Sequence, residues 1–228
     1  MSEALPSTAA VVPVFNPEPG LAALCAALCA AFPVVIVVND GSVENVADFA
    51  KLPRAVVRVN HAVNRGKGRA IKTALSWLME HRPDIQTAVF VDGDGQHRIE
   101  DVQAVAAHAG ARSCVTFGVR NFHGKDVPFR SWWGNAWTAW EVRLAFGFRL
   151  DDTQTGLRAI PSRLFASLHS LPGERFEYEA RIFRLLRRLH EPLEQVPIRT
   201  VYVAGNRASH FRPLRDTLLT QAALFFDF

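Results

Sequence analysis

The sequence predicts an α/β protein with a mostly parallel central sheet and helices on both faces, and three observations lead to that fold class. Short runs rich in Val and Ile alternate with helical patterns over the first two thirds of the 228 residues. Polar clusters follow directly after several of these runs, as loops do at the carboxyl edge of an open α/β sheet. The composition, 49% hydrophobic and 21% charged, allows a sizeable buried core.

Each apolar run and helical pattern can be assigned in order. The elements expected in the first part are a strand at 11–15, a helix at 21–31, a strand at 34–38, a weaker helix at 44–51, a strand at 55–59, a helix at 69–80 and a strand at 87–91. The uncharged segment 20–38 is long enough to cross a bilayer. Because Pro33 divides it into an Ala- and Leu-rich helix and a β-branched strand, we expect no membrane span there.

The second part has a different pattern. The expected elements are a helix at 99–109, a strand at 113–119, a basic and aromatic stretch at 120–149, a loop and short strand at 151–161, an amphipathic helix at 176–189 and a strand at 194–203. Neither an interdomain linker nor an internal repeat is evident. We therefore expect a flexible N-terminus over 1–10, one domain over 11–216, and an apolar C-terminal helix or tail over 217–228.

Charge and cysteine content narrow the classes of function only a little. The formal charge of +4 suits an anionic ligand without selecting one. The three cysteines lack ligand-like spacing to His or to other Cys, so we expect neither a disulfide framework nor a zinc site. No basic segment followed by an apolar run opens the chain, which disfavours a cleaved secretion signal. These features favour a cytoplasmic setting.

The strongest chemical signal is the segment 92–97, Asp-Gly-Asp-Gly-Gln-His, which comes directly after an expected strand. Asp92, Asp94 and Gln96 place three oxygen donors at alternate positions, and such donors suit Mg²⁺ or Mn²⁺. A metal held there can neutralise charge on a departing diphosphate. An isolated Asp-Gly turn would more often be a solvated loop. The strand before it and the two loops described next favour a metal site instead.

Two further loops belong with this motif. Asp40 follows the second expected strand, where its carboxylate can accept hydrogen bonds from a base or ribose, although a simple turn uses the same residues. The segment 64–69, Asn-Arg-Gly-Lys-Gly-Arg, opens a helix whose N–H groups and cationic side chains favour a phosphate-bearing ligand. Neither a Walker A loop nor a G-x-G-x-x-G fingerprint is present, so P-loop hydrolysis and dinucleotide dehydrogenation are disfavoured.

Together, the segments 12–16, 39–42, 64–68 and 92–97 resemble, in order and spacing, family-2 glycosyltransferases of the GT-A fold. The resemblance covers about residues 11–216 and is nearest to the branch that includes dolichyl-phosphate mannosyltransferase and bacterial polyprenyl-phosphate glycosyltransferases. It implies an inverting, metal-dependent hexosyltransferase that uses a UDP- or GDP-linked sugar.

The resemblance also implies roles for individual residues. Those expected to bind the nucleotide are Pro13, Asn16, Asp40, Asn64, Gly66, Lys67 and Asp92. The metal ligands would be Asp92, Asp94 and Gln96, with Asp94 also essential for turnover. Contacts to phosphate or acceptor would come from Arg120, Arg130, Ser131 and His210, although a solvated surface charge or a structural His explains some of them equally well.

The acceptor determines the role expected of Asp152, which lies in a loop resembling the family's acceptor side. A sugar hydroxyl needs a base, and Asp152, with Asp151 as the adjacent alternative, is the candidate. A lipid phosphate is already anionic, so Asp152 would then orient groups instead. We expect polyprenyl phosphate as acceptor, with a saccharide hydroxyl as the alternative. The other readings are a sugar nucleotidyltransferase, which the bulky, acidic segment 14–18 disfavours, and a non-catalytic nucleotide-sugar binding scaffold.

Membrane contact is expected to be peripheral. Trp133, Trp137, Trp140 and Leu144 recur at helical spacing beside arginines, a pattern that serves either a surface lying on an anionic membrane or a core-facing helix. The apolar stretch 218–228 is too short to cross a bilayer. No basic and aromatic platform of known spacing indicates nucleic-acid binding.

Overall fold

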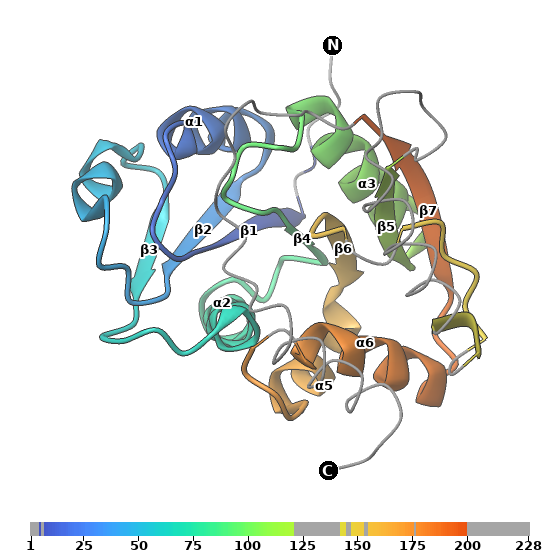
Figure 1. Cartoon of the computed structure of the whole chain (residues 1–228). Helices are drawn as coiled ribbons and strands as arrows, with labels where there is room; N and C mark the ends of the chain where they lie inside the picture. The colour runs from blue at the N-terminus through green and yellow to red at the C-terminus, as the bar shows by residue number, and fades with distance from the viewer. Residues whose placement is uncertain are drawn as a thin grey trace, which may run out of the picture.

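A seven-stranded sheet lies between two layers of helices in the computed structural model (Figure 1), which describes residues 5, 7–120, 142–144, 147–152, 155–175 and 177–199. The strands are β1 (Thr8–Val14), β2 (Val34–Asn39), β3 (Val57–Asn60), β4 (Thr87–Phe90), β5 (Val115–Arg120), β6 (Arg158–Pro161) and β7 (Leu193–Ile198). The helices are α1 (Leu21–Ala31), α2 (Lys67–His81), α3 (Ile99–Arg112), α5 (Phe165–Ser170) and α6 (Glu177–Arg188), with 3-10 turns η1 (Val46–Lys51) and η2 (Ser162–Leu164). The predicted fold class is confirmed.

The strand order places one antiparallel strand inside an otherwise parallel sheet. The order is β3-β2-β1-β4-β6-β5-β7, and β6 runs antiparallel to both of its neighbours. The carboxyl ends of the parallel strands therefore share one edge with the beginning of β6. Arg158, the first residue of β6, pairs with Phe90 at the end of β4 and with Phe117 of β5. The loop that precedes β6 consequently reaches the edge at which ligands bind in open α/β sheets.

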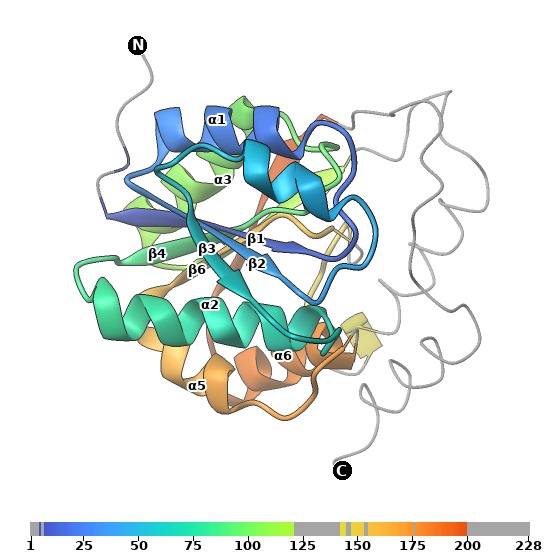
Figure 2. The ribbon, with the colours of Figure 1, turned by 90° about the vertical axis from the view of Figure 1, so that its left-hand side faces the viewer.

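The two faces of the sheet bury two separate apolar layers. Successive residues of a strand point to opposite faces, and along β2 Val35 packs in one layer whereas Ile36 packs in the other. Helices α1 and α3 cover the Val35 face, and α2, α5 and α6 cover the Ile36 face (Figures 1 and 2). Hydrophobic burial on both sides fixes the sheet and hence the positions of the loops at its carboxyl edge.

The predicted elements differ from the structure mainly at their ends. Strand β1 begins at Thr8, three residues before the predicted start, because this segment pairs with β4 as well as β2. Helix α3 continues to Arg112, and the helical segment 162–170 was not predicted. The predicted last strand ends earlier, at Ile198, and residues 200–203 lie outside the described part. Within the described residues, every helix is too short or too polar to span a membrane.

Candidate active site

The turn after β1 and the loop after β2 are joined through Asn16. Its side-chain oxygen accepts hydrogen bonds from the backbone N–H groups of Val43 and Glu44, at 2.9 and 3.1 Å. Its own N–H donates to the hydroxyl of Ser42 at 2.9 Å. Pro13 lies beside Val38 in the parallel pairing of β1 and β2. Pro13 and Asn16, two of the residues predicted to line the nucleoside pocket, therefore lie at the carboxyl edge of the sheet.

Asp40 joins the end of β2 to the beginning of α2. The residue is 3% exposed, and its carboxylate accepts hydrogen bonds from the backbone N–H groups of Arg65 at 2.9 Å and Gly66 at 2.7 Å. The ring of His61 contacts the same carboxylate through Nδ1 at 2.7 Å and the hydroxyl of Thr73 through Nε2 at 2.9 Å. These contacts set the position of the chain that enters α2.

Gly66 is required where α2 begins. Its φ of 105° is a conformation that side-chain-bearing residues rarely adopt, and a Cβ there would lie 2.4 Å from the carbonyl oxygen of Glu174. The predicted neighbour Asn64 accepts a hydrogen bond from Arg175 at 3.1 Å. The loop before α2 is thus packed against the segment that leads into α6.

Lys67, the first residue of α2, joins two acidic groups from different elements, Asp92 directly after β4 and Glu179 in α6. Its ammonium lies 2.8 Å from Oδ1 of Asp92 and 2.9 Å from Oε1 of Glu179. The same Glu179 oxygen lies 2.9 Å from Nη2 of Arg158, which is 2% exposed and stacks 5.4 Å from the ring centre of Phe117. Two carboxylates and two cations therefore alternate in one charged row, in the order Asp92, Lys67, Glu179 and Arg158.

Mutual attraction keeps this row of groups charged. Burial alone would raise the pKa of Asp92, but the charge and hydrogen bond of Lys67 outweigh it and hold the pKa at about 2. Burial likewise raises the pKa of Glu179, and Arg158 and Lys67 together lower it below its ordinary value. Asp92 and Glu179 are consequently ionised at neutral pH, and two positive side chains balance them.

Asp94 has a different environment although it lies only two positions from Asp92. Its Oδ1 accepts a hydrogen bond from the backbone N–H of Gln96 at 3.0 Å, which closes the turn. Burial, followed by the negative charge of Asp92, raises the pKa of Asp94. Burial also lowers the pKa of His97, against the charges of Asp92 and Asp94.

This donor set fits the expected divalent cation. Burial is the main cause of the raised pKa of Asp94, and the negative charge of Asp92 adds to it; a cation bound between the two carboxylates would relieve that repulsion. Gln96 is half-buried in the same turn. Hard oxygen ligands of this kind suit Mg²⁺ or Mn²⁺.

The backbone of Gly156 lies directly against Asp92. A Cβ at this position would be 1.7 Å from Oδ2 of Asp92 and 2.3 Å from its Cγ. Only glycine therefore leaves room for the carboxylate. Because β6 is antiparallel, the loop before it returns to the carboxyl edge and carries Gly156 to the end of β4.

Arg120 and Asp152 form a second charged pair at this edge. Nε of Arg120 lies 2.6 Å from Oδ2 of Asp152, Nη2 lies 3.1 Å from Oδ1, and the backbone N–H of Arg120 is 3.3 Å from Oδ2. The side chain of Asp152 is 0% exposed, whereas that of Arg120 is 24% exposed. The pair fixes the guanidinium at the end of β5.

Three predicted site residues, Arg130, Ser131 and His210, lie outside the described residues. Trp133, Trp137 and Trp140, whose spacing suits either a membrane-facing or a core-facing helix, also lie outside them. Conversely, sequence reasoning gave no individual role to His61, Gly156, Arg158 or Glu179, although Gly156 and Arg158 belong to the loop that resembles the acceptor side. The available signal for Arg158 was an arginine next to a short apolar run, whereas Glu179 has the pattern of an acidic residue in the first turn of a helix.

Comparisons with known proteins identify the family. The sequence profile of glycosyl transferase family 2 matches residues 9–168. The protein MJ1222 of Methanocaldococcus jannaschii, which is uncharacterised, is 28% identical over 84% of this chain and 80% of its own length. The UDP-N-acetylglucosamine–dolichyl-phosphate N-acetylglucosaminyltransferase of Methanococcus voltae is 27% identical over 76% of this chain and 77% of its own.

Solved structures show the same fold. Mannosyl-3-phosphoglycerate synthase from Rubrobacter xylanophilus superposes with a TM-score of 0.68 at 18% identity, covering 96% of this chain and 71% of that one. The fold is thus that of GT-A glycosyltransferases, and the family profile covers well over half of the sequence. The chain belongs to glycosyl transferase family 2.

Proposed function

We propose that this protein is an inverting glycosyltransferase that moves a hexose from a UDP- or GDP-linked donor to polyprenyl phosphate with the help of Mg²⁺ or Mn²⁺. One observation carries the proposal: Asp40 binds the backbone of Gly66, and the next residue, Lys67, binds Asp92. Loops that follow β2, β3 and β4 are therefore joined at one place on the carboxyl edge of the sheet. A pyrophosphate-bearing donor needs positive and hydrogen-bonding groups that are held in place in this way.

The nucleoside end of the donor is assigned to the loops after β1 and β2. Pro13, Asn16 and Asp40 would line this pocket together with Asn64. Asn16 and Asp40 hold these loops rigid through their backbone contacts, and a rigid pocket loses little entropy when it binds. Gly66 and Lys67 bring the amino end of the 15-residue helix α2 towards the phosphates.

The diphosphate end is assigned to Asp92, Asp94 and Gln96. A divalent cation held by these residues supplies positive charge for the nucleoside diphosphate as it leaves. Lys67 adds a second positive charge beside Asp92, and Glu179 holds it there. Gly156, which has no Cβ, leaves room for the carboxylate of Asp92 in this position.

The pairing of Asp152 with Arg120 favours a phosphate acceptor over a sugar hydroxyl. The carboxylate of Asp152 is fully buried and already accepts hydrogen bonds from the guanidinium of Arg120, so it is not placed to reach an acceptor hydroxyl. A lipid phosphate needs no base, because its oxygen is already anionic. Asp152 would then orient Arg120 towards the acceptor phosphate. The relative from Methanococcus voltae, named for transfer from UDP-N-acetylglucosamine to dolichyl phosphate, supports the same acceptor class.

In this proposal the enzyme works at the cytoplasmic face of a membrane as a peripheral protein, because its acceptor is a lipid. Arg130, Ser131 and His210 would add contacts to phosphate or acceptor. The proposal requires no nucleic-acid partner.

The test is transfer from radiolabelled UDP- and GDP-sugars to dolichyl phosphate in detergent, with and without Mn²⁺, followed by extraction of the lipid product. We expect metal-dependent label in the lipid phase and none with Asp94→Asn. Transfer to free saccharides instead would refute the lipid acceptor. Tight binding of a nucleotide sugar without transfer to any acceptor would favour the binding scaffold.

A further inference from the structure

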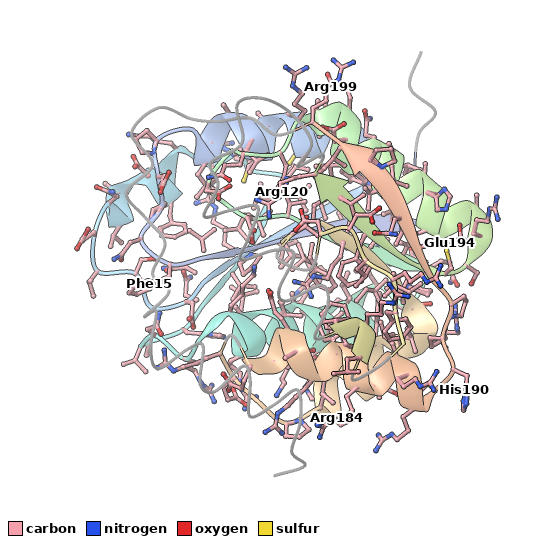
Figure 3. The ribbon with its side chains drawn as sticks, turned by 45° about the vertical axis from the view of Figure 1, so that its right-hand side comes forward. Phe15, Arg120, Arg184, His190, Glu194 and Arg199 are labelled. Atoms are coloured by element: carbon pink, nitrogen blue, oxygen red, sulfur yellow. The ribbon has the colours of Figure 1, made fainter. Side chains whose placement is uncertain are left out.

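A second group of metal-binding side chains lies at the opposite edge of the sheet from the candidate active site. His108 stands in the last turns of α3, Cys114 directly precedes β5, and Glu194 lies near the start of β7. On the paired strands β5 and β7, Thr116 faces Glu194 whereas Arg120 faces Ile198. Arg120 and Glu194 therefore occupy opposite ends of this strand pair (Figure 3).

The three potential ligand atoms are close together although the residues are distant in sequence. One nitrogen of His108, Sγ of Cys114 and a carboxylate oxygen of Glu194 all lie within 4.8 Å of one another. Nε2 of His108 is 2.6 Å from Oε2 of Glu194. Cys114 is 1% exposed, whereas the side chains of His108 and Glu194 are 29% and 35% exposed. A metal ion can thus enter from the solvent side and reach a buried sulfur.

The distances suit a small tetrahedral ion after a modest adjustment. Zn²⁺ binds His nitrogen, carboxylate oxygen and Cys sulfur at about 2.0–2.3 Å, so ligand atoms around it are about 3.3–3.8 Å apart. The hydrogen-bonded pair of His108 and Glu194 would open slightly, and Sγ would approach them. Both side chains are partly exposed and can move by this amount without disturbing the core.

The charges are also suitable. Glu194 supplies a carboxylate that already lies in hydrogen-bond contact with the imidazole of His108. A carboxylate and a thiolate together carry two negative charges, which balance a divalent cation. The nearby guanidinium of Arg112, 3.6 Å from Oε1 of Glu194, belongs to a side chain that is 64% exposed and can turn outwards. A ligand set that includes sulfur and imidazole selects Zn²⁺ over the Mg²⁺ or Mn²⁺ expected at Asp92.

We propose that His108, Cys114 and Glu194 bind one Zn²⁺, with water at the fourth position, and that the ion fastens α3 to β5 and β7. The site is independent of the proposed transferase activity. It would stabilise the strand pair that carries Arg120 at its other end. Sequence spacing did not reveal it, because Glu194 lies 86 residues beyond His108 and joins the others only in the folded chain.

Cobalt substitution tests the proposal with the full-length protein. After chelator treatment, Co²⁺ is titrated in the presence of excess Mg²⁺, which occupies oxygen-only sites. We expect one equivalent to produce a near-ultraviolet thiolate-to-cobalt charge-transfer band and intense visible bands of tetrahedral Co²⁺. Zn²⁺ should then abolish both. Oxygen ligands such as Asp92 and Asp94 cannot give the charge-transfer band.

Substitutions show which residues give rise to the charge-transfer band and bind Co²⁺. Cys114→Ser should remove the charge-transfer band, and His108→Ala and Glu194→Gln should weaken Co²⁺ binding at least tenfold. Cys29→Ser is the matched control, because Cys29 is a partly exposed thiol in α1, four residues from Cys25. It should leave the band unchanged. The proposal is overturned if wild-type protein gives no charge-transfer band. It is equally overturned if the band survives Cys114→Ser and disappears with Cys29→Ser.

Discussion

Replacing Gly156 by alanine should displace the carboxylate of Asp92 and so impair the proposed metal site. The new methyl carbon would lie 1.7 Å from Oδ2, whereas real Cβ atoms essentially never come closer than 3.0 Å to a neighbour. The carboxylate must therefore move by about 1.3 Å, the difference between these two distances. A misplacement of about 1 Å at a reacting centre can reduce the rate on the order of 100-fold. Overpacking would also cost about 1–3 kcal/mol of stability.

Two measurements on this variant separate the active-site effect from simple unfolding. Isothermal calorimetry should show at least tenfold weaker Mn²⁺ binding, and the lipid-transfer assay should show a larger loss. Gly110→Ala is the matched control, because Gly110 lies within helix α3 and the nearest atom outside the helix to its added Cβ, the hydroxyl oxygen of Thr87, is 3.9 Å away. It should retain activity and gain up to about 1 kcal/mol of stability. Wild-type metal affinity and activity in Gly156→Ala would refute the assigned position of Asp92.

The charged groups of the site lead to three further predictions. Lys67→Met removes the cation shared by Asp92 and Glu179, so it should lower the unfolding temperature. Mn²⁺ should then raise the unfolding temperature of this variant by more than it raises that of the wild type. Equal Mn²⁺-induced shifts in both proteins would contradict the pairing. Because the pKa of Asp92 falls from 3.8 to about 2, its stabilising contribution is complete above pH 4 and disappears as the pH falls towards 2. Urea unfolding across that range should be less pH-dependent in Lys67→Met than in the wild type, and identical slopes would argue against the ion pair. Asp152→Asn should raise KM for the lipid acceptor with little change for the donor, and a pH–rate profile that loses an acidic limb would instead identify Asp152 as a base.

The layered fold was predictable because its signals are local. Apolar runs such as 34–38 and the helical pattern at 21–31 specify a strand and a helix through their own periodicity. Parallel strands with polar residues at their ends then imply one functional edge. The antiparallel direction of β6 was not predictable in this way, since a four-residue strand carries no directional signal.

The site was predictable in its loops but not in its tertiary contacts. Asp40, Lys67 and Asp92 stand in recognisable segments, and the structure joins them through Gly66. The role of Glu179 depends on how α6 packs beside α2, because only that packing brings its carboxylate to Lys67. The sequence likewise does not show why residue 156 must be glycine, because the reason is the close approach of the Asp92 side chain in the folded chain.

Nucleotide binding with and without Mn²⁺ tests the central claim most directly. We predict that calorimetry of UDP and GDP with the wild-type protein will show one site whose affinity for the better nucleotide rises at least tenfold when Mn²⁺ is present. This gain should vanish in Asp94→Asn while the protein keeps its fold by circular dichroism. Equal nucleotide affinity with and without metal, or an unchanged gain in Asp94→Asn, would contradict a metal-bound diphosphate at this edge of the sheet.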